Sequence, residues 1–315
     1  MIEVEHLTKL YGQHPAVNDV TFRVEKGSIL GFLGPNGAGK STTMRMLTCY
    51  LPVTSGTIRV AGFDVFTNSM EVRRNIGYLP ENVPLYIEMR TRKYLDFVAQ
   101  AKGIPSGKRR AAVSDVIERC GLNNIADRII RNVSRGYRQR IGLAQALLSD
   151  PKVLIFDEPT IGLDPQQIID IRKLIKSLGG DHTVILSTHI LPEVLAVCDR
   201  VAIINEGRLV ANDTLENLTT KMADVPQIEV EVEGPVQRVL EAINTVQGVT
   251  GVTVRDRRDD GTSVMLVESR TGVDPRKDVA RVVHDNGWGL LQLKSLGLSL
   301  EDIFVRIVSG NSSAK

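Results

Sequence analysis

The chain has 315 residues, of which 42% are hydrophobic and 24% are charged, as is usual for a soluble globular protein. Its formal net charge of +2 gives no electrostatic reason to expect a nucleic acid as partner. Cys49, Cys120 and Cys198 are dispersed, which suits reduced thiols and argues against a disulfide framework or a zinc site. No apolar run reaches transmembrane length and the N-terminus lacks a signal-peptide pattern. We therefore expect a chain that is soluble by itself and meets a membrane only through a partner.

The first 30 residues have the alternation of a small antiparallel sheet. Ile2, Val4 and Leu7 are expected on one face, and residues 20–24 alternate apolar and polar side chains. Tyr11 falls in the turn between these strands. It is either a surface aromatic residue of that turn or a platform on which a purine ring stacks.

The next segment fits the phosphate-binding pattern G-x-x-x-x-G-K-[ST], between a predicted buried strand at residues 28–33 and a predicted helix that starts near residue 43. Glycines let the backbone wrap a phosphate, and the N–H groups at a helix N-terminus attract the anion. Lys40 would reach the terminal phosphates, and the Ser41 hydroxyl would bind Mg²⁺. The alternative is a glycine-rich turn that happens to precede a helix. The candidate nucleotide-binding residues are Gly34, Pro35, Asn36, Gly37, Ala38, Gly39, Lys40, Ser41 and Thr42.

Residues from about 85 to 150 have the periodicity of helices, inside a chain that otherwise alternates strands and helices. Thr91 and Ser106 are the expected N-caps of the first two helices, and Gly103 and Gly121 suit the left-handed residues that end them. Such a block predicts a helical subdomain. The other elements expected near it are strands at residues 57–62 and 76–80 and a third helix within residues 134–149.

An unbroken apolar run at residues 153–156 predicts a strand covered on both faces, and Asp157 and Glu158 follow it directly. A helix over residues 165–178 and an apolar strand over residues 183–189 would complete a parallel crossover, before a hairpin at residues 200–212. A carboxylate at such a strand end can hold Mg²⁺, and its neighbour can point at the water that attacks the terminal phosphate. The alternative is a pair of acids at a strand end that is exposed to solvent.

Apolar residues become sparse near residue 220. Residues 221–225 are expected to link an N-terminal domain, residues 1–220, to a second domain, residues 226–309. The second domain has the predicted order β-α-β-β-α-β, the ferredoxin-like arrangement. A last helix at residues 300–308 and a disordered tail at residues 310–315 complete the prediction.

Taken together and in this order, the motifs resemble those of the ATP-binding subunit of an ATP-binding cassette (ABC) transporter, over residues 2 to about 212. The resemblance implies that residues 133–140 are the signature motif and that residues 162–164 form the aspartate loop. It assigns Tyr11, Ser134, Gly136 and Asp164 to nucleotide binding beside the phosphate loop, Lys40, Glu158 and His189 to catalysis, and Ser41, Asp157 and Glu81 to the metal.

Two segments depart from the family pattern. In the signature, Val133, Arg135 and Tyr137 replace three of the usual residues. Glu81 stands where the family usually has a glutamine, and a carboxylate cannot donate the hydrogen bonds of an amide. Glu81 is therefore either a metal ligand or mainly the hinge to the helical subdomain. Both departures resemble the type-2 bacterial exporters, the gliding-motility-associated and drug-export-like group.

The resemblance implies the fold and the function. The fold would be α/β, a P-loop NTPase cassette with a mixed sheet core, an antiparallel β subdomain and a helical subdomain, plus a C-terminal α+β ferredoxin-like domain. The function would be ATP hydrolysis with Mg²⁺ by a cytoplasmic subunit, peripheral on the inner membrane, that pairs as a homodimer beneath a separate permease and powers export. Helices 92–120 and the Glu81 loop would dock the permease. The alternatives are a soluble non-transport ABC ATPase acting as a nucleotide-dependent binding module, and a structural subunit with an inactive site.

Overall fold

The computed structural model describes residues 1–217, 227–258, 261–270 and 273–296. The chain forms two compact units, Met1–Leu215 and Glu216–Lys315, each with a hydrophobic core of its own. The linker expected at residues 221–225, the helix expected at residues 300–308 and the tail from residue 310 lie outside the described residues. The domain limits drawn from the sequence therefore stay a prediction.

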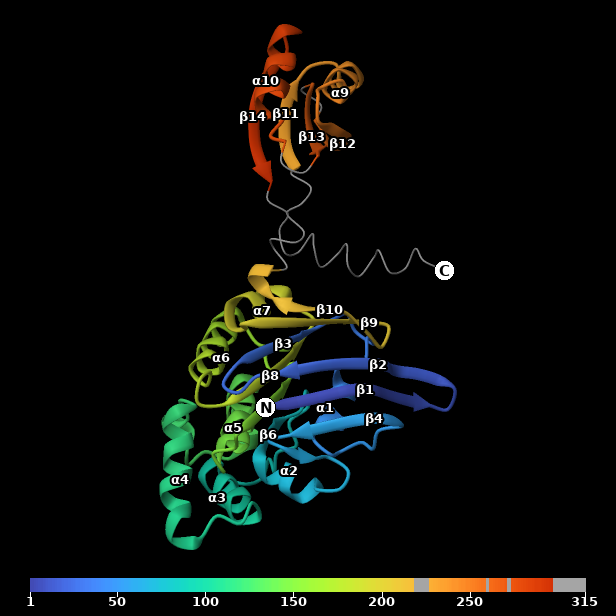
Figure 1. Cartoon of the computed structure of the whole chain (residues 1–315). Coiled ribbons are helices and arrows are strands. Elements are labelled where there is room, and N and C mark those ends of the chain that lie inside the picture. The colour runs from blue at the N-terminus through green and yellow to red at the C-terminus, as the bar shows by residue number, and fades with distance from the viewer. Residues whose placement is uncertain (218–226, 259–260, 271–272, 297–315) are drawn as a thin grey trace. The chain divides into compact units, whose positions relative to one another are not determined.

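The first unit is built on a six-stranded sheet in the order β10-β9-β3-β8-β7-β6 (Figure 1). Every residue of β3, β7 and β8 is buried, which explains their apolar sequences, because both faces of these strands are covered. The strands from β9 to β6 are parallel, and β10 pairs with β9 in the expected hairpin. The strands are β3 (Ile29–Leu33), β6 (Ile76–Leu79), β7 (Val153–Asp157), β8 (Thr183–Thr188), β9 (Arg200–Asn205) and β10 (Arg208–Thr214).

The parallel register brings three sequence motifs to one edge of this sheet. Leu33 at the end of β3 pairs with Thr188 at the end of β8, and Asp157 at the end of β7 pairs with Ser187. The phosphate loop, the acidic pair and His189 each follow one of these strand ends. An open α/β sheet places its ligand contacts at this edge.

Four helices accompany these strands. Pro165 stands at the start of α6, where its fixed φ suits a helix and its missing N–H costs nothing. The short helix after β8, α7, was not predicted; it packs on β3, β8 and α6. The helices are α1 (Lys40–Leu47), α5 (Arg135–Leu147), α6 (Pro165–Ser177) and α7 (Leu191–Val197).

The predicted antiparallel sheet is confirmed and has the order β2-β1-β4-β5. Its buried side chains, Ile2, Val4 and Leu7 among them, share one hydrophobic cluster with the parallel sheet. The rings of Phe22 in β2 and Phe32 in β3 lie 5.5 Å apart, so the two sheets are packed together rather than joined only by chain. The elements are β1 (Ile2–Tyr11), β2 (His14–Val24), β4 (Ser55–Val60), β5 (Phe63–Asp64) and the unpredicted helix α2 (Ser69–Asn75).

The helical block contains α3 (Thr91–Ala101), α4 (Ser106–Arg119) and α5, with two short 3₁₀ turns (Asn123–Ile125 and Ile130–Asn132) between the last two. The expected N-caps were wrong by one residue, because Arg90 and Pro105 precede these helices and neither makes a side-chain cap. Thr91 is instead fully buried. The glycines that end the helices are as predicted, with φ values of 78° and 64° at Gly103 and Gly121.

In the second unit, the described strands form an antiparallel sheet in the order β12-β13-β11-β14. Ile228, Val230 and Val232 alternate along β11 and pack with Val239 and Val279 from the two helices. The order of elements is β-α-β-β-α-β, the ferredoxin-like arrangement (Figure 1). The elements are β11 (Gln227–Glu233), α9 (Val236–Asn244), β12 (Val249–Arg257), β13 (Thr262–Ser269), α10 (Arg276–Asp285) and β14 (Gly289–Leu296).

Candidate functional site

The loop between β3 and α1, residues 34–39, is held against the backbone of two other strands. A Cβ atom added to Gly34 would stand 2.3 Å from the carbonyl oxygen of Ile204 in β9. One added to Gly39 would stand 2.4 Å from that of Ala16 in β2, and Gly39 has a left-handed φ of 102°. Only glycine fits either position, so these two glycines of the sequence pattern are a steric requirement of the fold.

A cavity of about 350 Å³ lies beside this loop. That volume is at the small end of the range for ligand pockets. A Cβ added to Gly37 would meet no atom of the described residues within 4 Å, so the loop backbone there is open. Ala38, in contrast, is buried. The residues that line the cavity are Ala16, Asn36, Gly37, Gly39, Lys40, Ser41, Thr42, Glu81, Glu158 and Ile161.

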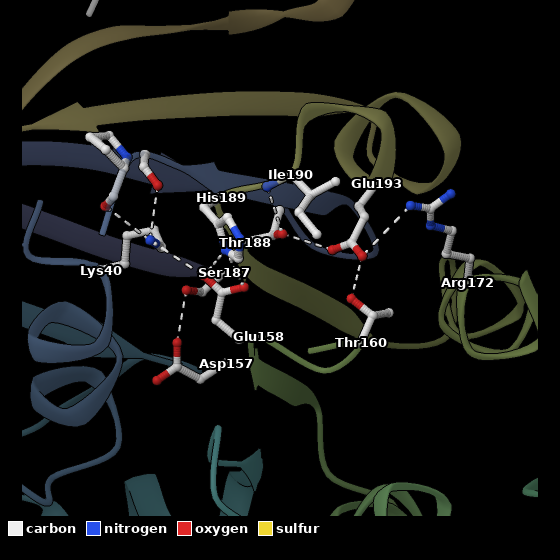
Figure 2. A network of polar contacts seen from close by, with 12 residues as sticks. Lys40, Asp157, Glu158, Thr160, Arg172, Ser187, Thr188, His189, Ile190 and Glu193 are labelled. Atoms are coloured by element: carbon white, nitrogen blue, oxygen red, sulfur yellow. Dashed lines mark hydrogen bonds and ion pairs between the residues drawn. The ribbon is translucent and has the colours of Figure 1, made fainter. Parts of the chain in front are cut away.

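The ammonium group of Lys40 is buried at the inner end of the loop. Its Nζ donates to the carbonyl oxygens of Gly34 at 2.9 Å and Pro35 at 3.1 Å. It also lies 3.4 Å from Oε1 of Glu158, with both side chains only 6% exposed (Figure 2). The loop and the acidic strand end are thus joined by a buried ion pair.

Asp157 is 2% exposed and is held by two hydroxyl groups. Ser187 Oγ donates to its Oδ1 at 2.8 Å, and Ser41 makes a second hydrogen bond. Burial raises the pKa of Asp157, the two hydroxyl hydrogen bonds lower it, and the negative charges of Glu158 and Glu81 raise it further. The ionised form of Asp157 is therefore disfavoured by burial and by the two neighbouring carboxylates.

Glu158 lies at the centre of the polar contacts. Its backbone has a φ of 49°, uncommon for a residue with a side chain, and its N–H donates to the carbonyl oxygen of Ser187 at 2.9 Å. Its carboxylate oxygens lie 2.9 and 3.0 Å from Nδ1 of His189. An ionised carboxylate only accepts, so Nδ1 carries the proton in this contact. Both acids are buried, so the alternative of a solvent-exposed strand end is wrong.

The donor set fits a magnesium-bound phosphate ligand. Lys40 pairs with Glu158, and the negative charges of Glu158 and Glu81 both act on Asp157, so an anionic ligand needs a further cation here. Ser41 and Asp157 supply the oxygen atoms that Mg²⁺ prefers. Among the described residues, His, Cys, Asp and Glu form no group of three that would hold a metal by itself. Mg²⁺ is usually bound by one or two carboxylates together with phosphates and waters.

The remaining predicted residues do not line this cavity. Tyr11 ends β1 and is 50% exposed, with Lys9 Nζ 5.6 Å from the centre of its ring. Ser134 is the N-cap of α5, where its hydroxyl accepts from the N–H of Tyr137 at 3.4 Å. Asp164 is the N-cap of α6.

Sequence reasoning missed a buried network beside the acidic pair. Ser187, Thr160 and Glu193 are all buried and bonded to residues at the strand ends. None of them belongs to a short local pattern of the kind that revealed the phosphate loop. Each contact spans roughly thirty residues or lies on α7, which was not predicted, so only the folded chain reveals them.

Comparison with known proteins identifies the family. A family model described as "ABC transporter" matches residues 17–161. The bacitracin transport ATP-binding protein BcrA of Bacillus licheniformis is 32% identical over 314 residues, covering 99% of this chain and 98% of that protein. The linearmycin resistance ATP-binding protein LnrL of Bacillus subtilis is 34% identical over 257 residues, covering 81% of this chain and 83% of that protein.

The fold has solved counterparts. A dimeric ATP-binding cassette in a post-hydrolysis state, bound to ADP and Pi, superposes with a TM-score of 0.63 at 23% identity. The match covers 68% of this chain and 99% of that chain. Within the described ranges, no helix of this protein is long and apolar enough to cross a membrane. Since a relative above 30% identity spans almost the whole chain, the chain belongs to the ABC transporter family, as an ATP-binding ATPase subunit of the group that contains BcrA and LnrL.

Proposed function

We propose that the chain binds Mg-ATP in the cavity beside residues 34–42 and hydrolyses it to drive export through a separate integral membrane permease. The observation that carries the proposal is the contact of the buried Lys40 and Glu158 with each other, and of Glu158 with the partly exposed His189, beside the phosphate loop. The relatives named for bacitracin transport and linearmycin resistance support the direction of transport. The subunit would work on the cytoplasmic face of the inner membrane.

The residues of the cavity divide the chemistry between them. Lys40 would hold the terminal phosphates, and Ser41 and Asp157 would hold Mg²⁺, with Glu81 beside them. Bound Mg²⁺ would offset phosphate charge and orient the transferred group. Glu158 would accept the proton of the attacking water at a carboxylate oxygen, and His189 would fix that carboxylate in place through Nδ1.

The residues outside the cavity suit a site shared by two copies of the chain. Ser134, Gly136 and Asp164 lie at the N-termini of α5 and α6, and none of them lines the cavity of its own chain. Ser134 and Asp164 are exposed at these helix N-termini, whose N–H groups would suit the phosphates held by a second copy. We therefore propose an ATP-bound homodimer, as in the dimeric cassette of known structure. Tyr11, half-exposed at the end of β1, would stack on adenine.

A second, larger hollow suits the permease. It has a volume of about 570 Å³ and is floored by Ile76, Tyr78 and Pro80, which lead directly to Glu81 of the nucleotide cavity. Pro84 lines the hollow, and two residues later Tyr86, 60% exposed, stacks edge to face on Phe97 of α3, which is 45% exposed. A permease segment seated here would contact β6, which leads to the site, and Lys102 at the end of α3. Opening and closing of the site could therefore be transmitted through Pro80 and Glu81.

The replacement of Glu158 by Gln tests the ATPase assignment. The change keeps the shape of the side chain and the magnesium ligand Asp157, but removes the base. Loss of a general base costs about 10²–10⁴-fold in rate. Steady-state phosphate release should fall by that factor while Mg-ATP still binds. Lys40→Ala is the control, and should lose binding as well. Turnover near that of the wild type would remove Glu158 from the role of base.

Charge placed on the exposed aromatic pair of Tyr86 and Phe97 tests the docking surface. Phe97→Glu should keep the ATPase activity of the isolated chain. The variant should no longer sediment together with membranes that contain the permease. Leu195→Glu is a matched control, because Leu195 is also exposed, at 40%, but lies on α7. Equal loss in both variants, or in neither, would contradict docking at this hollow.

A further inference from the structure

A carboxylate with no assigned role is buried behind the catalytic edge of the sheet. Glu193, on α7, is 1% exposed. Its Oε2 accepts a hydrogen bond from Thr188 Oγ1 at 2.7 Å, and its Oε1 accepts one from Thr160 Oγ1 (Figure 2). Arg172 of α6 lies 3.6 Å from Oε1. A charge this deep in a protein is costly unless it is paired and hydrogen-bonded, and here both conditions are met.

The first threonine fixes the backbone on both sides of His189. Thr188 directly precedes the histidine, and its hydroxyl oxygen also accepts from the N–H of Ile190 at 3.1 Å. Its carbonyl oxygen accepts from the N–H of Gly34 at 3.3 Å. The hydroxyl of Thr188 thus donates to Glu193 and accepts from the residue that follows His189. This hydroxyl therefore connects Glu193 to the backbone on either side of the histidine.

The second threonine belongs to the segment of Glu158. Thr160 follows Glu158 by two residues, and its carbonyl oxygen accepts from the N–H of Leu163 at 3.2 Å, closing the turn that leads to Asp164. One carboxylate therefore holds the segment that carries Glu158 and the segment that carries His189. The side chains of Glu158 and His189, which contact each other, thus come from two segments that are both hydrogen-bonded to Glu193.

The ion pair with Arg172 does not by itself account for this arrangement. At 3.6 Å it is longer than either threonine hydrogen bond, and the Arg172 side chain is 24% exposed. The arginine offsets the charge of Glu193, whereas the shorter contacts direct the carboxylate at the two threonines. Arg172 alone would leave the carboxylate oxygens short of hydrogen bonds, and the two threonines supply them from the segments that carry Glu158 and His189.

We propose that Glu193 is a positioning residue, which sets His189 against Glu158 through Thr188 and Thr160. This inference rests on the proposed roles of Glu158 and His189. Glu193 does not line the cavity beside the phosphate loop, so ATP binding should not depend on it. Its loss should lower kcat and leave the affinity for Mg-ATP unchanged.

Valine substitutions test the two links, because valine keeps the shape of threonine and removes the hydroxyl. Thr188→Val and Thr160→Val should each lower kcat by about tenfold or more, since a misplacement of about 1 Å can cost about 10²-fold. The dissociation constant for Mg-ATP should stay within about twofold, which separates positioning from binding. Thr188→Ser, which keeps the hydroxyl, should restore kcat.

Thr183→Val is the matched control. Thr183 lies on the same strand, is also buried, and its hydroxyl oxygen accepts from the N–H of Gly27 at 3.0 Å, away from the site. The Thr183→Val variant should lose about as much stability as Thr188→Val and keep the turnover of the wild type. If Thr188→Val and Thr183→Val lower Tm equally and neither changes kcat, the role of Glu193 is structural only and the proposal is wrong.

An NMR measurement separates this inference from the proposed function. In the wild-type chain, Glu158→Gln should shift the imidazole resonances of His189, which His189→Asn identifies. In a Glu193→Gln or Thr188→Val background, the same change should shift them much less, as in a double-mutant cycle. An undiminished shift overturns the positioning role whatever the ATPase rates are. Unchanged turnover in Glu158→Gln would overturn the proposed catalytic role of Glu158. The NMR shifts of His189 would still test whether Glu193 positions that histidine.

Discussion

The side-chain amide of Gln167 lies directly over Gly136. A Cβ atom added to Gly136 would stand 2.2 Å from Oε1 of Gln167, and the backbone N–H of Gln167 donates to the capping carboxylate of Asp164 at 2.9 Å. The start of α6 therefore packs closely against the start of α5 within one chain. The same two helix ends carry the residues proposed to complete the site of a second copy.

Gly136→Ala should be tolerated by the fold and harm the enzyme. The clashing atoms belong to the end of a flexible side chain, so Gln167 can rotate away and Tm should change little. If the backbone at residue 136 approaches phosphate, the added methyl group should lower ATPase activity by about tenfold, or about 1.4 kcal/mol. Gly136→Ala combined with Gln167→Ala should remain slow. Recovery in the double variant would place the fault in the Gln167 contact.

Asp157→Asn should stabilise the nucleotide-free protein. Burial raises the pKa of Asp157, so at a pH above its folded value the ionised group is costlier in the folded state than in the unfolded one. That penalty shrinks as the pH falls through the folded pKa and vanishes below the ordinary value of 3.8. A gain of about 1 kcal/mol would raise Tm by roughly 2–4 °C in a unit of this size.

Thermal unfolding of both proteins between about pH 8 and about pH 5 checks the sign of this effect. The difference in Tm should be largest at the alkaline end and decrease on acidification. Addition of Mg-ATP should raise Tm for the wild type and fail to do so for the variant. A variant that is less stable at every pH would contradict the account of Asp157.

A chain that ends at Thr220 should still fold and bind ATP. The compact unit that holds the candidate site ends at Leu215, and its buried cluster contains no residue of the second unit among those described. Its thermal transition should therefore persist, and Mg-ATP should raise its Tm. An insoluble product, or one without a nucleotide-dependent shift, would show that the two units depend on each other.

Two inactive variants should complement each other if the site is shared. Lys40→Ala damages the phosphate loop, and Ser134→Arg blocks the opposing helix end. In a mixed dimer both lesions fall in one site and the other site is intact. Random pairing makes roughly half of the dimers mixed, so about a quarter of all sites are whole. A mixture of the two variants should therefore recover ATPase activity.

Differently tagged variants allow the mixed dimer to be purified and assayed alone. Ser134 also caps α5, so its replacement should cost about 1 kcal/mol of stability, and Ser134→Ala measures that cost without the added bulk. A purified mixed dimer that shows no turnover would mean that the site is not shared or that both sites must act together. With both lesions on one chain, mixing with wild type should give no gain over wild-type dimers alone.

Much of the fold could be predicted because its signals are local. The apolar runs before Asp157 and His189 are buried strands, and the alternation from residue 2 is an antiparallel sheet, because burial on two faces or one dictates those patterns. The left-handed Gly103 and Gly121 end helices as expected, since few other residues adopt that backbone. Helix starts were less well predicted. Thr91 and Ser106 are residue types that favour the N-cap, but in the fold each is the first residue inside its helix.

The phosphate loop could be read from nine consecutive residues, because close backbone packing and a helix N-terminus both act within the loop. No short pattern relates Glu193 to Thr160, or Ser187 to Asp157, which lie about thirty residues apart and meet only through strand pairing and the packing of α7. The sequence by itself thus pointed to the candidate groups Lys40, Ser41, Asp157 and Glu158. The tertiary structure decided which of them are buried, paired and held against one another, because burial and charge compensation depend on neighbours distant in the chain.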